Sequence, residues 1–227
     1  MEFTFSEELQ MLRDTVRRFT ESEVKPLAEQ IDREGEIPRR LIDGVIELGL
    51  LGIPFSEEYG GVGLGEMGYC VAMEELARGC ASLSATVAAH VSIGATAIDL
   101  GGSTELKQKY LPMLCAGEKI AAYALTEAGA GSDAAAMSTT AVEDGDDYIL
   151  NGEKIYVTNG GFADVVTTFA VTDPEKRARG GITCFVVESA WPGFSVGTVE
   201  EKLGLCGSST AVLRYENLRV PKENIVG

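Results

Sequence analysis

The sequence predicts an α+β protein in which an N-terminal all-α helical domain precedes an antiparallel β-barrel or β-sandwich domain. Two features of the chain indicate this order. Apolar residues first recur at spacings of three and four, and from Ile120 onward the period drops to two. The 227 residues, 45% of them hydrophobic, suffice for a sizeable core. We therefore expect a helical domain over residues 1–118 and a β domain, carrying the ligand-binding segments, over residues 119–227.

The first two helices have recognisable ends. Thr4 and Glu7 match a capping box at the start of the first helix. Its apolar stripe consists of Leu9, Leu12, Val16 and Phe19. Pro38 is expected to open the second helix, and Gly49 or Gly52 to end it, because glycine adopts the left-handed conformation most easily.

Three further helices complete the helical half. A glycine-rich loop leads into a helix over residues 67–77, and a long helix of small residues is predicted over residues 82–100. Ser103 or Thr104 is expected to cap the last helix. Pro112 lies inside this last helix, where it is expected to bend or shorten the helix.

The single histidine and the scattered cysteines exclude several kinds of site. His90 lies in an apolar stretch with helical spacing, and no second histidine exists to complete a two-histidine metal site. We interpret it as a buried, hydrogen-bonded structural residue. The five cysteines form no Cys-x-x-Cys pair, so we expect no metal site and no disulfide framework, but free thiols.

Charge and hydropathy bear on partners and location. Asp and Glu number 35 against 19 Lys and Arg, and the net charge of -16 disfavours nucleic acid or an anionic membrane as a partner. We expect no membrane helix, because we find no apolar run that approaches the roughly 20 residues such a helix needs. The N-terminal "MEFTFSEELQ" lacks the pattern of a signal peptide. We therefore expect a cytoplasmic protein.

The second half contains short β-rich runs separated by turn residues. These runs are "MSTTAVE", "YILNGEKIYVT", "DVVTTFAVT", "ITCFVVES" and "LRYENLRV". The pairs Asp144-Gly145 and Asn151-Gly152 indicate hairpin turns, because both tolerate the positive φ of tight two-residue loops. Several antiparallel strands in a barrel or sandwich are therefore expected.

The stretch "YALTEAGAGSD", residues 123–133, is the first candidate for a ligand-binding segment. Glycines allow the backbone to approach an anion closely, and Ser132 adds a hydroxyl donor to the same target. Phosphate is the expected ligand. The stretch lacks the lysine of a P-loop and the helix of a Rossmann turn, so a purely structural turn is the alternative.

The stretch "GEKIYVTNGG" is the second candidate. By two-residue alternation Tyr156 and Thr158 fall on one face of a strand, and Val157 on the other. A ring and a hydroxyl on one face can contact a flat heteroaromatic ligand and its ring nitrogens, and Tyr123 and Leu125 can do the same. Ordinary strand residues are the alternative.

Together these segments resemble the acyl-CoA dehydrogenase family. Its middle domain carries a Tyr-x-Leu-Thr-Glu-x-x-x-Gly-Ser-Asp pattern followed by an aromatic-x-Thr-Asn strand, here residues 123–133 and 156–159. The resemblance extends from "FSEEL" through "GIPFSEEYGG" to "KLGLCGSSTAVLRYENLRVPKENIVG". It implies α,β-dehydrogenation of an acyl-CoA thioester, and "LGLCGSSTA" resembles the short-chain branch.

The resemblance implies FAD as the cofactor. The implied FAD-binding residues are Tyr123, Ala124, Leu125, Thr126, Gly131, Ser132, Tyr156, Val157 and Thr158. Ser132 is also similar to a family residue that contacts the acyl-CoA. Two positions depart from the family pattern: Tyr156 stands where tryptophan is frequent, and Ala128 replaces a common proline.

In this family a third, helical domain follows, and it supplies the catalytic glutamate and the main oligomer contacts. The sequence ends at Gly227, so we expect no catalytic residue in this chain and little or no activity from it alone. Glu127 and Asp133 border the first segment, but loop carboxylates more often cap backbone amides. The resemblance also implies an electron-transfer flavoprotein as acceptor and a homo-oligomer for the complete protein.

Two other functions stay open at this point. One is a non-enzymatic module of the same fold that binds a nucleotide, CoA or a protein partner. The other is a flavin oxidase or monooxygenase, which oxygen consumption by the reduced flavin would distinguish from a dehydrogenase.

Overall fold

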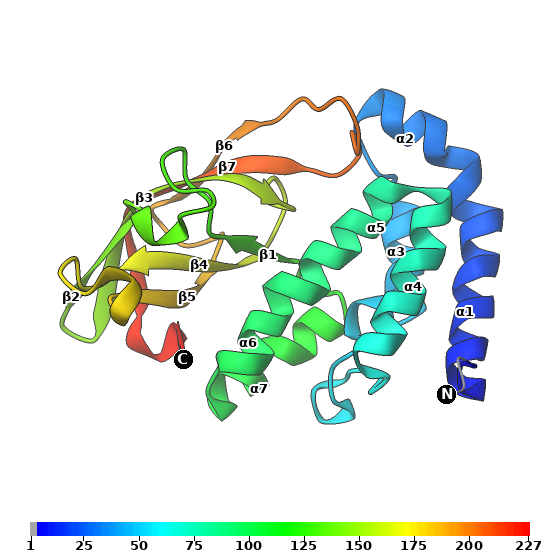
Figure 1. The fold of residues 1–227 in the computed structure, drawn as a ribbon, viewed down its shortest axis with the longest axis horizontal. Helices are drawn as coiled ribbons and strands as arrows, with labels where there is room; N and C mark the ends of the chain where they lie inside the picture. The colour runs from blue at the N-terminus through cyan, green and yellow to red at the C-terminus, as the bar shows by residue number, and fades with distance from the viewer. Residues whose placement is uncertain (1–3) are drawn as a thin grey trace.

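The computed structural model describes residues 4–227 and divides them into a helical part and a strand-rich part (Figure 1). The α-helices of these residues are α1 (Glu7–Phe19), α2 (Ala28–Glu34), α3 (Arg39–Glu47), α4 (Gly65–Gly79), α5 (Ala81–Ala88), α6 (Thr96–Gly101) and α7 (Thr104–Cys115). The strands are β1 (Ala121–Ala124), β2 (Thr140–Asp144), β3 (Asp147–Thr158), β4 (Val165–Val171), β5 (Ile182–Glu188), β6 (Phe194–Val199), β7 (Thr210–Pro221) and β8 (Ile225–Val226).

The helix ends follow the sequence, with one shift of position. Helix α3 begins directly after Pro38, and Gly49 has a φ of 68° in the left-handed region. Helix α1 is capped by Ser6, whose Oγ accepts the Leu9 N–H at 3.3 Å. The predicted capping box at Thr4 is therefore wrong: the hydroxyl that precedes the first helical residue directly is the one that reaches the free amide.

Helix α7 is capped by Ser103, whose Oγ accepts the Leu106 N–H at 3.1 Å. Pro112 lies within α7, and the helix continues past it to Cys115. The predicted shortening is therefore wrong. The apolar residues around the proline are buried, and this packing keeps the last turn in place.

The longest helix of the described residues runs from Ala81 to Gly101, with a π-helical segment, Ala89–Ala95, between α5 and α6. By length and composition this helix is long and apolar enough to cross a membrane, which the sequence analysis had not expected. However, 61% of its most apolar window is buried inside the protein. We therefore interpret it as a core helix.

The strands form one mixed sheet in the order β6-β7-β3-β2-β4-β5-β8, and β1 pairs with β4. β1 runs parallel to β4, from the pair Ala121 and Val165 onward, and β2 also meets β4 in parallel. The prediction of helices followed by a strand-rich part is confirmed. The expectation of purely antiparallel strands or a closed barrel is wrong, because the sheet is mixed and is not a closed barrel.

The parallel pairing has a local cause at Ile120. The carbonyl of Ile120 accepts the N–H groups of Asp164 and Val165 at 2.9 and 3.1 Å, and its own N–H donates to Asp164 Oδ2 at 2.8 Å. β1 and β4 therefore start from one point and run in the same direction. The two-residue period of each strand carries no information about this neighbour, so the sequence analysis missed it.

One predicted hairpin turn is confirmed and the other is wrong. β2 ends at Asp144, β3 begins at Asp147, and Gly145 between them has a φ of 64°. Gly152 instead lies inside β3 at a shift in the pairing with β7. A Cβ at Gly152 would lie 2.5 Å from Thr139 Oγ1, so this glycine permits a close approach and makes no turn.

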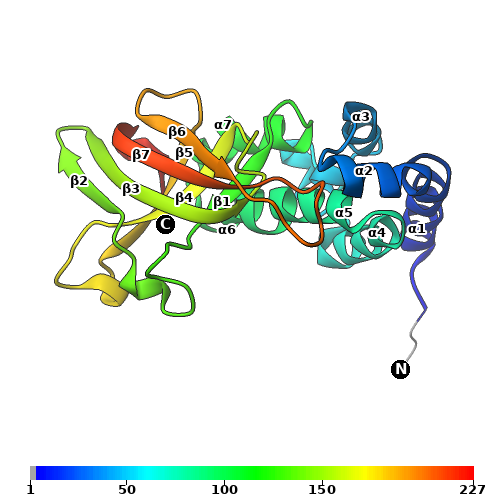
Figure 2. The ribbon, with the colours of Figure 1, turned by 90° about the horizontal axis from the view of Figure 1, so that it is seen from above.

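The helical part and the sheet share a hydrophobic core. Ala121, Val165 and Val186 of the sheet belong to the same buried cluster as the apolar residues of the helices. Figure 2 shows the helices and the sheet beside each other along the long axis, with β1 next to the long helix. The loop between β6 and β7 extends to α2, where a Cβ at Gly207 would lie 2.3 Å from Ile31 Cγ2.

Two buried polar side chains join the helix to β1. His90 is fully buried, and its Nδ1 accepts the Ala121 N–H at 2.9 Å. Asn159 Nδ2 donates to the carbonyls of Thr86 and Ala121 at 2.9 and 3.2 Å. The interpretation of His90 as a packed, hydrogen-bonded residue is confirmed, and the bond at Nδ1 places the proton of the neutral ring on Nε2.

We predict that His90 makes the stability of the protein depend on pH. Burial lowers the pKa of His90 from 6.5 to about 4, so the unfolded chain takes up this proton at a higher pH than the folded chain. The stability that the neutral ring provides is complete above pH 6.5 and is lost as the pH falls toward 4. The loss should be about 3 kcal/mol.

The measurement is urea unfolding at several pH values between 7 and 4. In a His90→Asn variant, the amide oxygen can accept the Ala121 N–H but does not titrate. The variant should therefore be less stable than the wild type at pH 7, and this gap should narrow or reverse toward pH 4. A gap that stays constant over this range would contradict the prediction, because carboxylate titration is common to both proteins.

Candidate functional site

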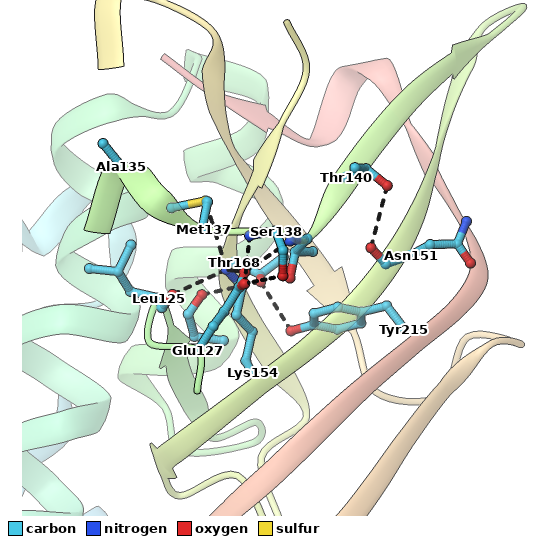
Figure 3. A network of polar contacts seen from close by, with 12 residues as sticks. Leu125, Glu127, Ala135, Met137, Ser138, Thr140, Asn151, Lys154, Thr168 and Tyr215 are labelled. Atoms are coloured by element: carbon cyan, nitrogen blue, oxygen red, sulfur yellow. Dashed lines mark hydrogen bonds and ion pairs between the residues drawn. The ribbon is translucent and has the colours of Figure 1, made fainter. Parts of the chain in front are cut away.

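The two candidate segments lie side by side in the fold (Figure 3). The Ile155 N–H donates to the Thr126 carbonyl at 2.9 Å. Lys154 Nζ donates to the Leu125 carbonyl at 3.1 Å. The chain that leaves β1 is therefore bonded directly to the last part of β3. The structure therefore brings Leu125 and Thr126 of the first segment next to the part of β3 that directly precedes Tyr156.

The loop after β1 presents backbone donors to its surroundings. Glu127 and Ala130 exchange two backbone hydrogen bonds, of 3.1 and 3.0 Å, and close a tight turn. Gly131 and Ser132, which follow, are exposed. Within residues 4–227, the N–H groups of Thr126, Gly131 and Ser132 donate to no protein acceptor. A Cβ at Gly131 would meet nothing within 4 Å, so open space lies beside these donors.

The second segment contains a β-bulge. Lys154 pairs with Leu213 and Val157 with Ala211, so β3 has one residue more than β7 over this stretch. Tyr156 lies in the bulge with a φ of 57°, a conformation that is rare for an aromatic residue, and its side chain is 64% exposed. Val157 is buried and Thr158 half-buried. The exposed ring and the buried valine agree with the predicted alternation, although the bulge was not predicted.

A buried ion pair holds the first segment to β3. Lys154 is fully buried, and its Nζ lies 2.7 Å from Glu127 Oε1. Glu127 also accepts the N–H and the hydroxyl of Ser138, at 2.6 and 2.7 Å, and the Thr139 N–H at 3.0 Å. Burial alone would raise the pKa of Glu127, but these donors outweigh it and lower the pKa to about 2.

The sequence analysis missed Lys154 altogether. Leu150, Gly152 and Lys154 share one phase of the two-residue period, and Leu150 is fully buried. A lysine in the inward phase of a strand is the signal that would have found it, because an ammonium group is buried only when it is paired. Its partner Glu127, expected to cap amides, does so at Ser138 and Thr139.

Hydroxyl groups fix the carbonyls of β1. Thr168 Oγ1 donates to the Ala124 carbonyl at 3.2 Å, and the Tyr215 hydroxyl, which is fully buried, donates to Thr168 Oγ1 at 3.0 Å. Tyr123 is half-buried, and its ring packs edge-on against Phe169, with 5.2 Å between the ring centroids. One face of the Tyr123 side chain is thus covered by Phe169.

The candidate segments line an open surface. They do not line the cavity of about 640 Å³ that lies between α3 and the loop from β3 to β4. A smaller hollow of about 480 Å³ adjoins Ser132: it is lined by Asp133 and residues 135–136 and by residues 175–179 of the loop between β4 and β5. Arg177 Nη1 bonds the two sides of this hollow together through the carbonyls of Ala135 and Met137.

Comparison with known families agrees with this architecture. The family model "Acyl-CoA dehydrogenase, N-terminal domain" matches residues 6–118, and "Acyl-CoA dehydrogenase, middle domain" matches residues 122–218. The short-chain-specific acyl-CoA dehydrogenase of Clostridium acetobutylicum is 45% identical over 227 residues. That alignment covers 100% of this chain and 60% of the relative.

Two solved structures are similar as well. A chain in a structure of the electron transferring flavoprotein of Acidaminococcus fermentans has a TM-score of 0.97 and 44% identity, over 100% of this chain and 60% of that one. An acyl-CoA dehydrogenase of Bacillus anthracis, solved in complex with FAD, has a TM-score of 0.90 and 42% identity, over 98% of this chain and 38% of that one.

The chain spans only part of the curated relatives, 60% of the Clostridium protein and 58% of an acyl-CoA dehydrogenase of Bacillus subtilis. Within this span the two family models match the helical part and the strand-rich part in order, and together they cover far more than half of the chain. The chain therefore belongs to the acyl-CoA dehydrogenase family.

Proposed function

We propose that this chain is the FAD-binding portion of a flavin-dependent acyl-CoA dehydrogenase that acts on a short-chain acyl-CoA. The observation that carries the proposal is the contact between the two segments, which sets unpaired N–H groups and an exposed aromatic ring on neighbouring stretches of backbone. The short-chain preference is supported by the relative from Clostridium acetobutylicum, which is short-chain specific. The division into residues 1–118 and 119–227 is part of this proposal.

The residues fit an isoalloxazine nucleotide. We propose that the backbone from Tyr123 to Thr126 and the bulge from Tyr156 to Thr158 border the ring system, and that Gly131 and Ser132 donate to the diphosphate. The open space beside Gly131 allows such an approach, because no side chain fills it. When bound, FAD supplies a hydride acceptor for the β-carbon of the thioester. Amide donors aimed at the ring stabilise the negative charge of its reduced form.

We do not assign removal of the substrate proton to Glu127, the buried carboxylate beside the candidate segments. Glu127 is held by Lys154 and by two amides, and its low pKa makes it a poor base. We propose that the base comes from a part of the protein outside these residues and that this chain alone is inactive or nearly so. Ser132 is also proposed to contact the acyl-CoA, and an electron-transfer flavoprotein is the proposed acceptor. The complete protein is proposed to be a cytoplasmic homo-oligomer.

We predict that Gly131→Ala weakens FAD binding without harming the fold. The added methyl group meets nothing within 4 Å, so the free energy of unfolding should stay the same or rise by up to about 1 kcal/mol. In the complex the methyl group would occupy the space of the ligand, and the Kd for FAD should rise on the order of tenfold, about 1.4 kcal/mol. Calorimetric titration with FAD measures this change.

The matched control is Gly204→Ala in the loop between β6 and β7, where an added Cβ also meets nothing within 4 Å. This variant should bind FAD as the wild type does. A wild-type protein that folds but takes up no FAD would overturn the proposed function. Equal affinities of the two alanine variants would show only that Gly131 is not part of the site.

We also predict a difference between Tyr156→Gly and Tyr156→Ala. Both variants lose the exposed ring, so both should bind FAD more weakly than the wild type. Glycine adopts the left-handed conformation freely, whereas alanine keeps a Cβ there, so the glycine variant should be more stable by about 1 kcal/mol. Urea unfolding of the two ligand-free proteins tests this order. Equal stabilities would mean that the bulge relaxes once the ring is removed.

A further inference from the structure

The buried ammonium group of Lys154 contacts three groups of the protein. Its Nζ donates to the Leu125 carbonyl at 3.1 Å and to Glu127 Oε1 at 2.7 Å, and lies 3.8 Å from Met137 Sδ. The side chain is fully buried. Two of these three contacts are therefore to the loop that follows β1, and the third is to the end of the same loop (Figure 3).

The contact to Leu125 fixes the direction of one peptide plane. In a trans peptide the C=O and the following N–H point to opposite sides. Because the Leu125 carbonyl points to Lys154, the Thr126 N–H points away from β3. The next carbonyl, that of Thr126, is taken by the Ile155 N–H at 2.9 Å. Thr126 thus has its carbonyl bonded and its N–H free, among residues 4–227, to bond a ligand.

Through its contact with Glu127, Lys154 also affects the backbone at the far end of the loop. Glu127 accepts the amides of Ser138 and Thr139, so one carboxylate joins the beginning of the loop to its end. Gly131 and Ser132, whose amides are also free, lie between these two fixed points. Lys154 therefore bonds to residues that fix the Thr126 amide and to the carboxylate that fixes both ends of the loop carrying the Gly131 and Ser132 amides.

We propose that Lys154 is a positioning residue: through the Leu125 carbonyl and Glu127, it orients the free amides of Thr126, Gly131 and Ser132 toward the ligand. The inference rests on the proposed function. Stability does not account for the pair, because apolar residues of similar volume often replace a buried ion pair without loss. The direction of the Leu125 carbonyl, in contrast, needs a donor at this place in the core.

The test compares two variants with the wild type. Lys154→Met keeps an unbranched side chain one atom shorter than that of lysine and leaves Glu127 buried without its partner. Lys154→Met with Glu127→Gln removes both charges, so the cost of an unpaired buried charge disappears, but the Leu125 carbonyl still lacks its ammonium donor. The control is Arg214→Met, which breaks the exposed pair between Arg214 of β7 and Glu153 of β3, at 2.8 Å.

The expected outcome separates stability from positioning. Lys154→Met should unfold at a lower urea concentration, and the double variant should recover most of this loss. Both variants should bind FAD on the order of tenfold more weakly, as expected for the loss of one hydrogen bond from a charged donor. The bound flavin should also show a changed visible absorption spectrum in both. Arg214→Met should bind FAD unchanged.

A double variant that recovers both stability and FAD affinity would overturn the proposal, because the pair would then matter only as a neutralised charge. A second readout needs no FAD. Amide hydrogen exchange at Glu127, Ala130 and Ile155, whose N–H groups are bonded within this loop and β3, should be faster in the double variant than in the wild type. Unchanged exchange would also overturn the proposal. If wild-type protein bound no FAD, the proposed function would fail, and hydrogen exchange would still decide the role of Lys154.

Discussion

The backbone of Ala121 is the point on which the arrangement of helices and sheet depends. Its N–H is bonded to His90 of the long helix, and its carbonyl to Asn159, which also bonds the helix at Thr86. Ala121 belongs to the buried cluster that the helices share with the sheet, and His90, Asn159 and Thr86 are buried as well. β1 is therefore fixed to the helix at its first residue, and its register with β4 is set there. The hydrogen bonds at Ala121 therefore also set the position of the loop that follows β1.

In the candidate site too, side chains from elements distant in the sequence bond backbone groups and fix their positions. Side chains from other strands donate to the last carbonyl of β1 and to the next one. Thr168 donates to the Ala124 carbonyl, and Lys154 donates to the Leu125 carbonyl. These donors hold the backbone by its oxygens, and the N–H of Thr126, which follows, donates to no acceptor among residues 4–227. A donor held in this way needs no rearrangement to bond an acceptor, which lowers the entropic cost of binding one.

Local patterns in the sequence predicted the parts of the fold that depend on local physics. The start of α3 at Pro38 and the turn at Gly145 follow from the conformational preferences of proline and glycine. The two candidate segments were found because their residue order resembles a known family. Their contact with one another was expected from that resemblance, whereas the Lys154 contacts were not.

The missed features depend on partners that are distant in the chain. The parallel pairing of β1 with β4 depends on Ile120 and Asp164, and the close approach of Thr139 explains Gly152. The bulge at Tyr156 arises from the pairing of β3 with β7. No window of a few residues contains both partners of such contacts. The sequence around Gly152 therefore predicts a turn, whereas in the structure this glycine allows Thr139 to approach the strand closely.

The burial of His90 has a consequence for the behaviour of this part of the protein around neutral pH. No other histidine is present in the sequence, and this one stays uncharged until the solution is strongly acidic. The formal net charge of -16 therefore changes little across the range in which cells regulate their acidity. Any electrostatic attraction or repulsion that this surface exerts is therefore nearly constant there. A property that varied with proton concentration near neutrality would then report on groups other than this histidine.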